Sequence, residues 1–575
     1  MSSRRSLAVS ALVASLAAAS GLSAATVNVT VNAGAQRRPI NPLIYGVNFA
    51  DVGRLSVVPY PLNRWGGNAT TRYNWRVDTH NTASDWFFMN VADEAADVAR
   101  LPDGSSADRF IAGTLDHGSQ PLLTVPTIGW TPRWQGLTVA EARNKRWGFS
   151  IAKYGPQKNH ECLQAGWPSW CTQDAGDGTC SGGANCSQGV IVGNDPHDTS
   201  EPIDASFVGE WVVHVVGKVG RANAGGLRYY ALDNEPMLWN NTHRDVHPTP
   251  LDRDELWART VAIAGAVKAR DAAAKILGPD TWGYCDLYGS AADVAAPGPS
   301  CVDGPDRASH GGLPLVEWYL EKVCAHPGRR LVDYVDLHYY PQGSCVSGFG
   351  CDGEDAAHST DRLESLKELY DPAWTSESWI GSAGEPPVRL IPKVKEWIAA
   401  RCPGTGLAIT EYRWGSDDGP SAALAQAELL AIFGREGVDL ATRWVAPAPE
   451  TATEDAFRLY LDYDPVAAGF QKILGESVAA TSADRDTVGA YAVRGAAGKL
   501  WVLLFNHGTA ENTAHVSFAG KPVRGPAALF RFQPAAAAGS RLLRAGALPA
   551  GAVMDVVLPA RTAAVALVTL RKRSG

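Results

Sequence analysis

The sequence lacks the features of several common protein classes. Its 52 lysine and arginine residues are outnumbered by 60 aspartate and glutamate residues, and no long basic run occurs outside the two termini. Because a nucleic-acid partner requires a concentrated positive surface, we expect none. No G-x-S-x-G or H-E-x-x-H motif is present, so nothing indicates a peptidase.

Apolar runs long enough to span a membrane are also absent. The stretch from Leu7 to Ala19 is too short to cross a bilayer, and no second one follows. It is preceded by Arg4-Arg5 and followed by Ser23-Ala24-Ala25, which is the three-part pattern of a secretory signal peptide. We therefore expect residues 1–25 to be a signal peptide, the protein to be secreted, and no membrane partner.

The 10 cysteines do not show the C-x-x-C spacing of a zinc site. In an exported protein, cysteines that lie close together along the chain are more plausibly joined as disulfides. Four such pairs occur: Cys162 and Cys171, Cys180 and Cys186, Cys285 and Cys301, and Cys345 and Cys351. Cys324 and Cys402 are left over, and we expect them to pair at long range.

The chain is 45% hydrophobic and 19% charged, as in ordinary globular proteins. Helical spacing of apolar residues over 207–219, 255–274 and 421–436 alternates with short apolar runs that read as buried strands. Eight such runs occur: Leu43–Phe49, Leu62–Trp65, Pro121–Val125, Leu227–Leu232, Lys275–Gly278, Val332–His338, Leu407–Thr410 and Leu440–Trp444. Repeated strand-helix units predict an α/β fold, and eight of them predict a (β/α)8 TIM barrel over residues 43–480.

Two regions lack this alternation of strands and helices. Residues 155–200 are loop-like and contain four cysteines, which indicates an insertion on one face of the barrel. Residues 481–575 alternate as short strands with turn clusters between them, which predicts a smaller all-β sandwich. In the segment 26–42, Thr26–Val31 alternates with period two, and we expect it to join the sandwich as an edge strand, so that both chain ends build this domain.

Two glutamates end strands on opposite sides of the predicted barrel mouth. Glu235 follows the fourth strand and Glu411 the seventh, and reactive groups in such barrels lie at these carboxyl ends. A single strand-end glutamate is more often a helix cap or part of an ion pair. A facing pair of carboxyl groups is what cleavage of a glycosidic bond requires. Arginine, asparagine, histidine and tyrosine at neighbouring strand ends favour this functional interpretation.

Four motifs around these positions resemble glycoside hydrolase family 44. They are Asn-Arg-Trp-Gly-Gly-Asn at 63–68, Leu-Asp-Asn-Glu-Pro at 232–236, Asp-Leu-His-Tyr-Tyr-Pro at 336–341 and Ile-Thr-Glu-Tyr at 409–412. The resemblance implies a retaining endo-β-1,4-glucanase or xyloglucanase with a (β/α)8 barrel and a β-sandwich. It also implies that Glu235 is the general acid/base and Glu411 the nucleophile.

The neighbouring residues fit this division of roles. We expect Arg64 and Tyr340 to hold Glu411 ionised, because an adjacent cation or hydrogen-bond donor favours the charged form. Asn234 is placed to bind the sugar 2-hydroxyl, and His338 to orient the acid/base or the sugar. A core histidine without a role is the alternative for His338. Asn68, the last residue of the first motif, is a further candidate substrate ligand.

The chain is rich in tryptophan, with 19 residues, and flat indole rings can stack on sugar rings. Trp65, Trp414 and Trp444 fall at or just beyond predicted strand ends, and we expect them to bind substrate, with core packing as the alternative. The chemistry requires no cofactor. Asp195 and Asp198 in the Gly-rich insertion, with Glu94, are candidate ligands of a structural calcium, although a solvated acidic turn would look the same.

The sequence therefore predicts a secreted, monomeric enzyme that cleaves internal β-1,4-glucosidic bonds of cellulose-type glucans and xyloglucan by double displacement, with a β-glucan as its partner. One alternative is the same chemistry on glucomannan, xylan or mannan. A second is a non-catalytic carbohydrate-binding protein on a degenerate barrel.

Overall fold

The computed structural model describes residues 25–297, 301–351, 353–382, 385–520 and 523–571. The predicted signal peptide lies outside these residues except for its last position. No helix in the described ranges is long and apolar enough to cross a membrane.

Eight strands close into a barrel, as the sequence predicts. Each pairs in parallel with its neighbours, in the ring order β14-β15-β16-β17-β18-β3-β4-β8. Their bounds are β3 Gly46–Asn48, β4 Leu62–Trp65, β8 Gln120–Val125, β14 Tyr229–Leu232, β15 Lys275–Thr281, β16 Tyr334–Tyr339, β17 Gly406–Tyr412 and β18 Leu440–Arg443. Every one of the eight predicted runs contributes a strand to this ring.

Two barrel strands, β3 and β15, differ from the predicted bounds by three residues at one end. β3 is short because Pro42–Tyr45 forms a 3-10 helix, with the side chain of Asn41 accepting a hydrogen bond from the Leu43 amide. β15 is longer because it continues through Pro279, where its pairing with β16 shifts register. Proline cannot donate to a strand ladder, so the sequence alone predicts that the strand stops there. The longer strand carries Asp280 towards the barrel mouth.

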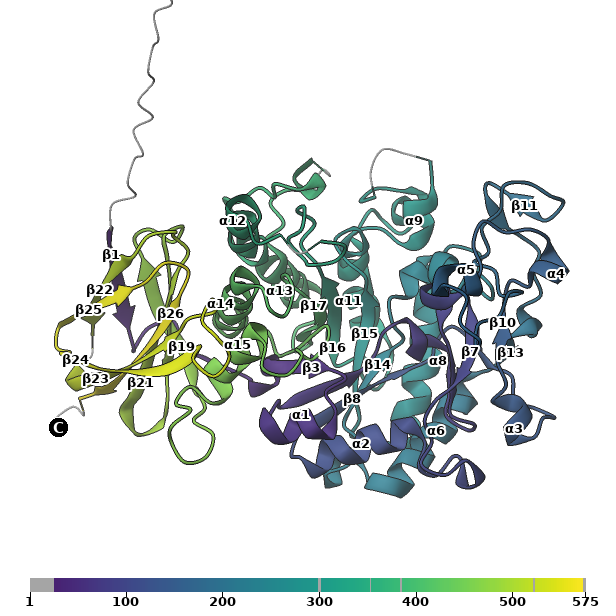
Figure 1. Ribbon diagram of the computed structural model, residues 1–575, viewed down its shortest axis with the longest axis horizontal. Helices are drawn as coiled ribbons and strands as arrows, with labels where there is room; N and C mark the ends of the chain where they lie inside the picture. Colours follow the sequence, from purple (N-terminus) through teal and green to yellow (C-terminus); the bar gives the residue numbers. More distant parts are fainter. Residues whose placement is uncertain (1–24, 298–300, 352, 383–384, 521–522, 572–575) are drawn as a thin grey trace, which may run out of the picture.

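Helices cover the outside of the barrel (Figure 1). They include α6 Ala205–Val219, α8 Arg253–Arg270 and α14 Pro420–Glu436, which correspond to the three predicted helices. α14 is buried around most of its circumference because it lies between the barrel and the second domain, and it packs on α15 Ala452–Leu461. A helix that is apolar on nearly all sides is typical of such a position.

The second domain is a ten-stranded sheet folded into a sandwich. Its strands are β1 Thr26–Asn32, β2 Arg38–Pro39, β19 Glu476–Ser482, β20 Val488–Arg494, β21 Lys499–Asn506, β22 Asn512–Ala519, β23 Val523–Phe532, β24 Leu542–Leu548, β25 Val553–Leu558 and β26 Ala563–Leu570. The two chain ends meet here, since β1 pairs in parallel with β22 and antiparallel with β19. The prediction of an edge strand is wrong, because β1 has a partner on each side.

β21 joins the two domains through its two faces. Leu500, Val502 and Leu504 lie in the core inside the sandwich, together with Val29 of β1. The alternate residues Trp501, Leu503 and Phe505 belong instead to the apolar core that is continuous with the barrel. This period-two division buries the strand on both sides and attaches the sandwich to one flank of the barrel.

A disulfide-containing lobe lies at the opposite end of the molecule from the sandwich (Figure 1). It combines the 155–200 insertion with a small sheet in the order β10-β7-β6-β5, formed by Arg146–Trp147, Met89–Ala92, Thr79–Asn81 and Tyr73–Asn74. Disulfides join Cys162 to Cys171 and Cys180 to Cys186 within it. The other three predicted pairs, Cys285–Cys301, Cys345–Cys351 and Cys324–Cys402, are also present.

Candidate active site

The two glutamates predicted to act together lie together. A carboxylate oxygen of Glu235, one of Glu411 and a ring nitrogen of His338 all fall within 4.8 Å of one another. Glu235 and Glu411 line one pocket of about 280 Å³ at the carboxyl ends of the barrel strands, with Asn68, Tyr340 and Trp444. One sugar-sized space is therefore bordered by two carboxyl groups.

The backbone after β14 directs Glu235 into this pocket. Asp233 and Glu235 both adopt left-handed conformations, with φ of 71° and 48°, and Pro236 then begins a short helix. The buried carboxylate of Asp233 fixes the turn by accepting hydrogen bonds from the amides of Thr127 and Ile128, at 2.5 and 3.1 Å. Left-handed backbone at non-glycine residues is costly and often marks functional sites, which agrees with the position of Glu235.

Glu411 is held by two donors, as the sequence predicts. Nη1 of Arg64 lies 2.7 Å from Oε1, and the hydroxyl of Tyr340 lies 2.7 Å from Oε2. Arg64 is fully buried at the end of β4 and also donates to Asn48 and Asn234, at 3.1 and 2.9 Å. A guanidinium and a phenol directed at the same carboxyl group favour its ionised form.

Glu235 occupies the opposite electrostatic environment. Burial raises the pKa of Glu235 to about 7; the hydrogen bond from His338 opposes this shift and the nearby charge of Glu411 adds to it. The guanidinium of Arg64 contacts Glu411 and not Glu235. A carboxyl group suited to hold a proton therefore faces one that is paired with a guanidinium.

His338 connects Glu235 to Asp280, a residue that sequence reasoning missed. Its Nδ1 lies 2.8 Å from Oε1 of Glu235, and its Nε2 lies 2.5 Å from Oδ1 of Asp280. Burial lowers the pKa of His338, but the charges of Glu411 and Asp280 outweigh burial and raise it well above the usual value. His338 therefore links Glu235 to Asp280 through its two ring nitrogens.

Asn68 and Asn234 line the same pocket as Glu235 and Glu411, and they are hydrogen-bonded to each other. Oδ1 of Asn234 accepts from Arg64 and from the amide of Gly67, both at 2.9 Å, and its Nδ2 donates to Asn68 at 3.2 Å. Asn68 donates in turn to Asp85, which also lines the pocket and was not predicted. These bonds fix the side-chain amide of Asn234 at the edge of the sugar-sized space.

Of the three predicted tryptophan platforms, the structure places only Trp444 in the pocket. Gly67 makes room for it: φ is 79°, and a Cβ at this position would lie 2.5 Å from Cη2 of Trp444. Trp65 packs instead against Tyr73 and Phe110, with ring centroids 5.7 and 5.3 Å away. The sequence predictions of platforms at the other two tryptophans therefore do not hold, because both rings are used for packing.

Trp414 also packs away from the pocket. It is 2% exposed, and its indole Nε1 donates to Ser365 at 3.0 Å. An indole ring at a strand end thus points into the helix layer outside the barrel rather than to the mouth. Side chains of a strand alternate in direction, and position along the strand does not by itself show which tryptophans reach the pocket.

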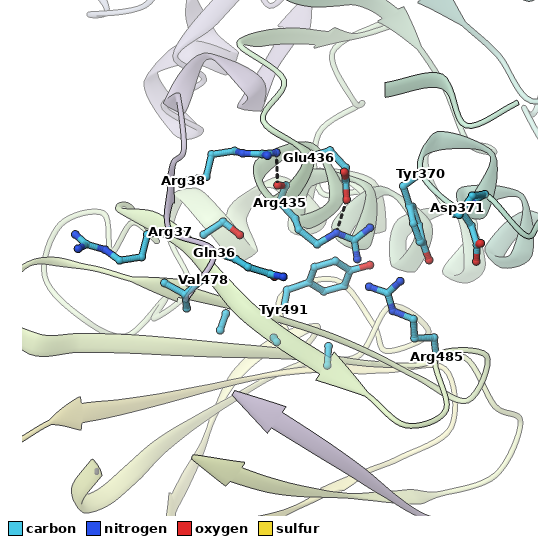
Figure 2. Close-up of a pocket in the computed structure, with 15 residues that line it drawn as sticks. Gln36, Arg37, Arg38, Tyr370, Asp371, Arg435, Glu436, Val478, Arg485 and Tyr491 are labelled. Atoms are coloured by element: carbon cyan, nitrogen blue, oxygen red, sulfur yellow. Dashed lines mark hydrogen bonds and ion pairs between the residues drawn. The ribbon is translucent and has the colours of Figure 1, made fainter. Parts of the chain in front are cut away.

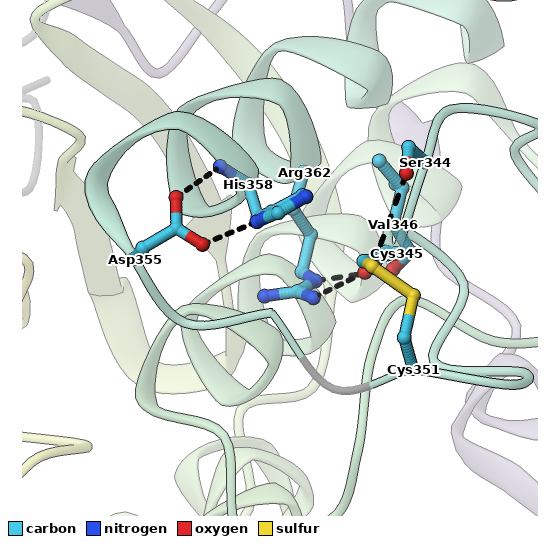
Figure 3. Close-up of a disulfide and its surroundings, with 7 residues drawn as sticks. All are labelled: Ser344, Cys345, Val346, Cys351, Asp355, His358 and Arg362. Carbon is cyan, nitrogen blue, oxygen red and sulfur yellow. Dashed lines mark hydrogen bonds and ion pairs between the residues drawn. A yellow bond between two sulfur atoms is a disulfide. The ribbon is translucent and has the colours of Figure 1, made fainter.

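Phe349 is a further aromatic side chain in the pocket that the sequence analysis did not identify. It is 50% exposed, lines the same space as the two glutamates, and packs edge-on against Tyr340 with centroids 5.1 Å apart. Its loop follows β16 and is closed by the disulfide Cys345–Cys351. Figure 3 shows this disulfide next to Arg362, which donates to the carbonyl oxygens of Cys345 and Val346 at 2.6 and 3.1 Å.

The predicted calcium ligands have protein partners. Asp195 accepts a hydrogen bond from the amide of His197 and contacts its ring. Asp198 accepts hydrogen bonds from Lys153 and from Tyr154, each at 2.5 Å. Among the described residues, Asp195, Asp198 and Glu94 do not form a group with ligand atoms close enough to share an ion. The arrangement matches a solvated acidic turn, and it gives the calcium prediction no support.

Comparison with known proteins agrees with this geometry. The family model described as glycoside hydrolase family 44 matches residues 79–343. Endoglucanase A of Paenibacillus lautus is 30% identical over 482 residues, a match that covers 82% of this chain and 62% of that protein. The chain therefore spans less than two thirds of that relative's length.

Two solved structures extend the likeness to nearly the whole chain. CelM2, a bifunctional glucanase-xylanase from a metagenome library, is 33% identical, with a TM-score of 0.85 over 96% of this chain and 100% of that one. Cel44A, a family 44 endoglucanase from Clostridium thermocellum, is 25% identical, with a TM-score of 0.74 over 95% and 100% of the two chains. With the paired glutamates and the two-domain fold in place, the chain belongs to glycoside hydrolase family 44.

Proposed function

We propose that the protein is a secreted endo-β-1,4-glucanase that cleaves internal glucosidic bonds with retention of configuration. The observation that carries this proposal is the approach of Glu235 and Glu411 within 4.8 Å in one open pocket. Retaining enzymes hold their two carboxyl groups about 5–5.5 Å apart, whereas inverting enzymes leave roughly 6.5–9.5 Å for a water molecule. The short separation supports direct attack by a carboxylate.

In the first step, the carboxylate of Glu411 attacks the anomeric carbon and forms a glycosyl ester. The bond from that carbon to the leaving oxygen breaks, and Glu235 donates its proton to this oxygen, so the shortened chain leaves as a neutral alcohol. The raised pKa of Glu235 supports its protonated state at the start. Arg64 and Tyr340 support the ionised state of Glu411.

In the second step, Glu235 acts as a base. It takes a proton from a water molecule whose oxygen attacks the anomeric carbon, and the ester bond to Glu411 breaks. Two displacements at the same carbon restore its original configuration. Both carboxyl groups return to their starting protonation states, so no external reactant other than water is consumed.

The substrate class is a β-1,4-glucan, including cellulose-type chains and xyloglucan. The names endoglucanase A and glucanase-xylanase support a glucan backbone, and the second name favours xylan as the strongest alternative. The test is hydrolysis of carboxymethyl-cellulose, xyloglucan, xylan and mannan side by side, with viscosity and reducing ends measured together. A rapid fall in viscosity on the glucans supports internal cleavage; release of reducing ends only from xylan or mannan contradicts the proposed backbone.

The retaining mechanism is tested separately. Proton NMR of the first product from a cello-oligosaccharide should show the β-anomer, and Glu411→Gln should abolish turnover while oligosaccharide binding persists. Glu511→Gln is the matched control, because Glu511 is exposed on the sandwich. An α-anomer as first product, or full activity of Glu411→Gln, would contradict the double displacement.

Secretion and the monomeric state are further proposals, and calcium binding at Asp195 and Asp198 stays a prediction from the sequence. Five disulfides support an oxidising compartment. The mass of the protein recovered from a culture medium tests secretion and removal of residues 1–25, and light scattering tests the monomer. A chelator that leaves the melting temperature unchanged would contradict a structural calcium at Asp195 and Asp198.

A further inference from the structure

A cavity of about 590 Å³ lies between the barrel and the sandwich, away from the catalytic pocket. Its walls come from the segment around β2, the end of α14, the residues after the short helix Ser365–Leu369, and strands β19 and β20. α14 ends just before β18 begins, and β2 precedes β3. The cavity is therefore at the amino-terminal ends of the barrel strands, opposite the mouth that holds Glu235.

Two arginines in this cavity have guanidinium nitrogens without acceptors. Nε of Arg435 donates to Glu436 at 2.6 Å, but its Nη1 and Nη2 are buried without a hydrogen-bond partner in the part of the chain that the structure describes. Arg485 has no hydrogen-bond or ion-pair partner among the described residues. Buried donors without acceptors are unfavourable, so an acceptor ligand would gain strong bonds here.

The guanidinium groups of both arginines lie against tyrosine rings that line the cavity. Arg435 lies 4.2 Å from the ring centroid of Tyr370 and 5.1 Å from that of Tyr491, and Arg485 lies 5.1 Å from that of Tyr370. Figure 2 shows both arginines extending into the region between the two rings. The tyrosines add polarised ring surface, but they accept no hydrogen bond from Nη1 or Nη2 of Arg435.

The cavity has an excess of positive charge. Four arginines line it, at positions 37, 38, 435 and 485, against the acidic residues Asp371 and Glu436. Arg37 is neutralised outside the cavity by Glu476, with contacts of 2.7 to 2.9 Å, and it points away from the group in Figure 2. Arg38 is exposed and donates to the carbonyl oxygen of Arg435 at 2.7 Å. Arg435 and Arg485 are therefore the two arginines of this cavity that are left to bind an anion.

We infer that this junction cavity binds an acidic saccharide, with Arg435 and Arg485 donating to the carboxylate of a uronic acid. Guanidinium groups match the planar geometry of a carboxylate. The volume falls in the range of small-molecule sites and exceeds what a bare inorganic ion needs, while the tyrosine and alanine side chains offer apolar surface to a sugar ring. This site is independent of the proposed catalytic function.

Binding of glucuronate tests the inference, with glucose and inorganic phosphate as the comparison ligands. Titration calorimetry should show one glucuronate per chain, and glucuronate should raise the melting temperature, because both domains form the cavity and a ligand of the folded state stabilises it. Glucose should do neither. Phosphate bound as tightly as glucuronate, or glucose bound equally well, would overturn the assignment to an acidic saccharide.

Variants identify the site. Arg485→Gln should weaken glucuronate binding about tenfold or more, as expected for loss of a charged hydrogen bond. Arg544→Gln, which removes an exposed arginine of β24, should leave binding unchanged, and Arg485→Lys should retain part of it because the positive charge remains. All three should hydrolyse neutral glucan at the wild-type rate.

The absence of glucuronate binding to the wild-type protein would overturn the inference, and so would equal affinities of Arg485→Gln and Arg544→Gln. Melting temperatures of the unliganded variants establish that each is folded before it is compared. A failure of this site would leave the catalytic proposal unaffected, because hydrolysis is measured on neutral substrates.

Discussion

Nδ1 of His338 lies 2.8 Å from Oε1 of Glu235, which places a buried cation directly on the side chain proposed to donate the catalytic proton. This contact lowers the pKa of Glu235 while burial and Glu411 raise it, and the balance is about 7. The proton affinity of the acid/base is thus set by its neighbours, and each neighbour can be changed separately.

The first prediction concerns pH. Above about pH 7 the fraction of protonated Glu235 declines, so kcat/KM should fall on the alkaline side with an apparent pKa near this value. His338→Asn removes an interaction that lowers the pKa of Glu235, and the alkaline limb should therefore move to higher pH. Profiles of kcat/KM against pH for both proteins measure the shift. A limb that stays in place or moves to lower pH contradicts the arrangement.

The second prediction concerns chemical rescue. Glu235→Ala should still form the glycosyl ester from aryl glycosides with good leaving groups, because these need no proton, and azide should then restore turnover by attacking that ester. The product should be a β-glycosyl azide, since two displacements have occurred. In Glu411→Ala, azide would replace the nucleophile and give the α-product after a single displacement. Identical products from the two variants would reject the assigned roles.

The third prediction concerns the disulfide-closed loop. Phe349 is half exposed beside Tyr340 and borders the pocket, so Phe349→Ala should lower kcat/KM on oligosaccharides roughly three- to tenfold, mainly through KM. Phe349→Tyr keeps the ring and should retain most of the efficiency. Steady-state kinetics on a cello-oligosaccharide measure both. Unchanged KM in the alanine variant would show that no sugar reaches this ring.

The fourth prediction concerns the glycine beneath Trp444. Gly67→Ala places a methyl group against the indole at a left-handed position, and it should lower both the melting temperature and kcat/KM. Gly136→Ala is the matched control: φ is 71°, but nothing lies within 4 Å of the added Cβ. Backbone strain alone would lower stability equally in both variants. Loss of activity confined to Gly67→Ala therefore reports the contact with Trp444.

Much of the fold was predictable because buried parallel strands are short apolar runs, and all eight barrel strands left this pattern in the sequence. The position of Asp280 could not be predicted, because a proline at 279 is typical of a strand end. Only the pairing with β16 shows that the strand continues. The edge position predicted for Thr26–Val31 also failed. The local sequence of a strand does not show which distant strands pair with it, so the position of β1 between β19 and β22 could not be predicted.

The proximity of Glu235, Glu411 and His338 was predictable because strand order fixes where strand ends meet. Aromatic platforms were less so: Trp65 and Trp414 share the strand-end position of Trp444 but pack elsewhere. Phe349 lies in a loop whose path depends on a disulfide and on Arg362, and no periodic pattern marks it. Loops that face the substrate carry the part of the site that sequence spacing does not specify.

The two-sided burial of β21 has a consequence for how the chain can be shortened. Trp501, Leu503 and Phe505 complete the same apolar cluster that surrounds the barrel, so a truncated protein ending before this strand would leave that cluster open to water. Such a fragment would be prone to aggregate, and heat should melt the intact molecule in one cooperative transition. The β-sandwich is accordingly needed for the stability of the barrel and cannot be removed as an independent module.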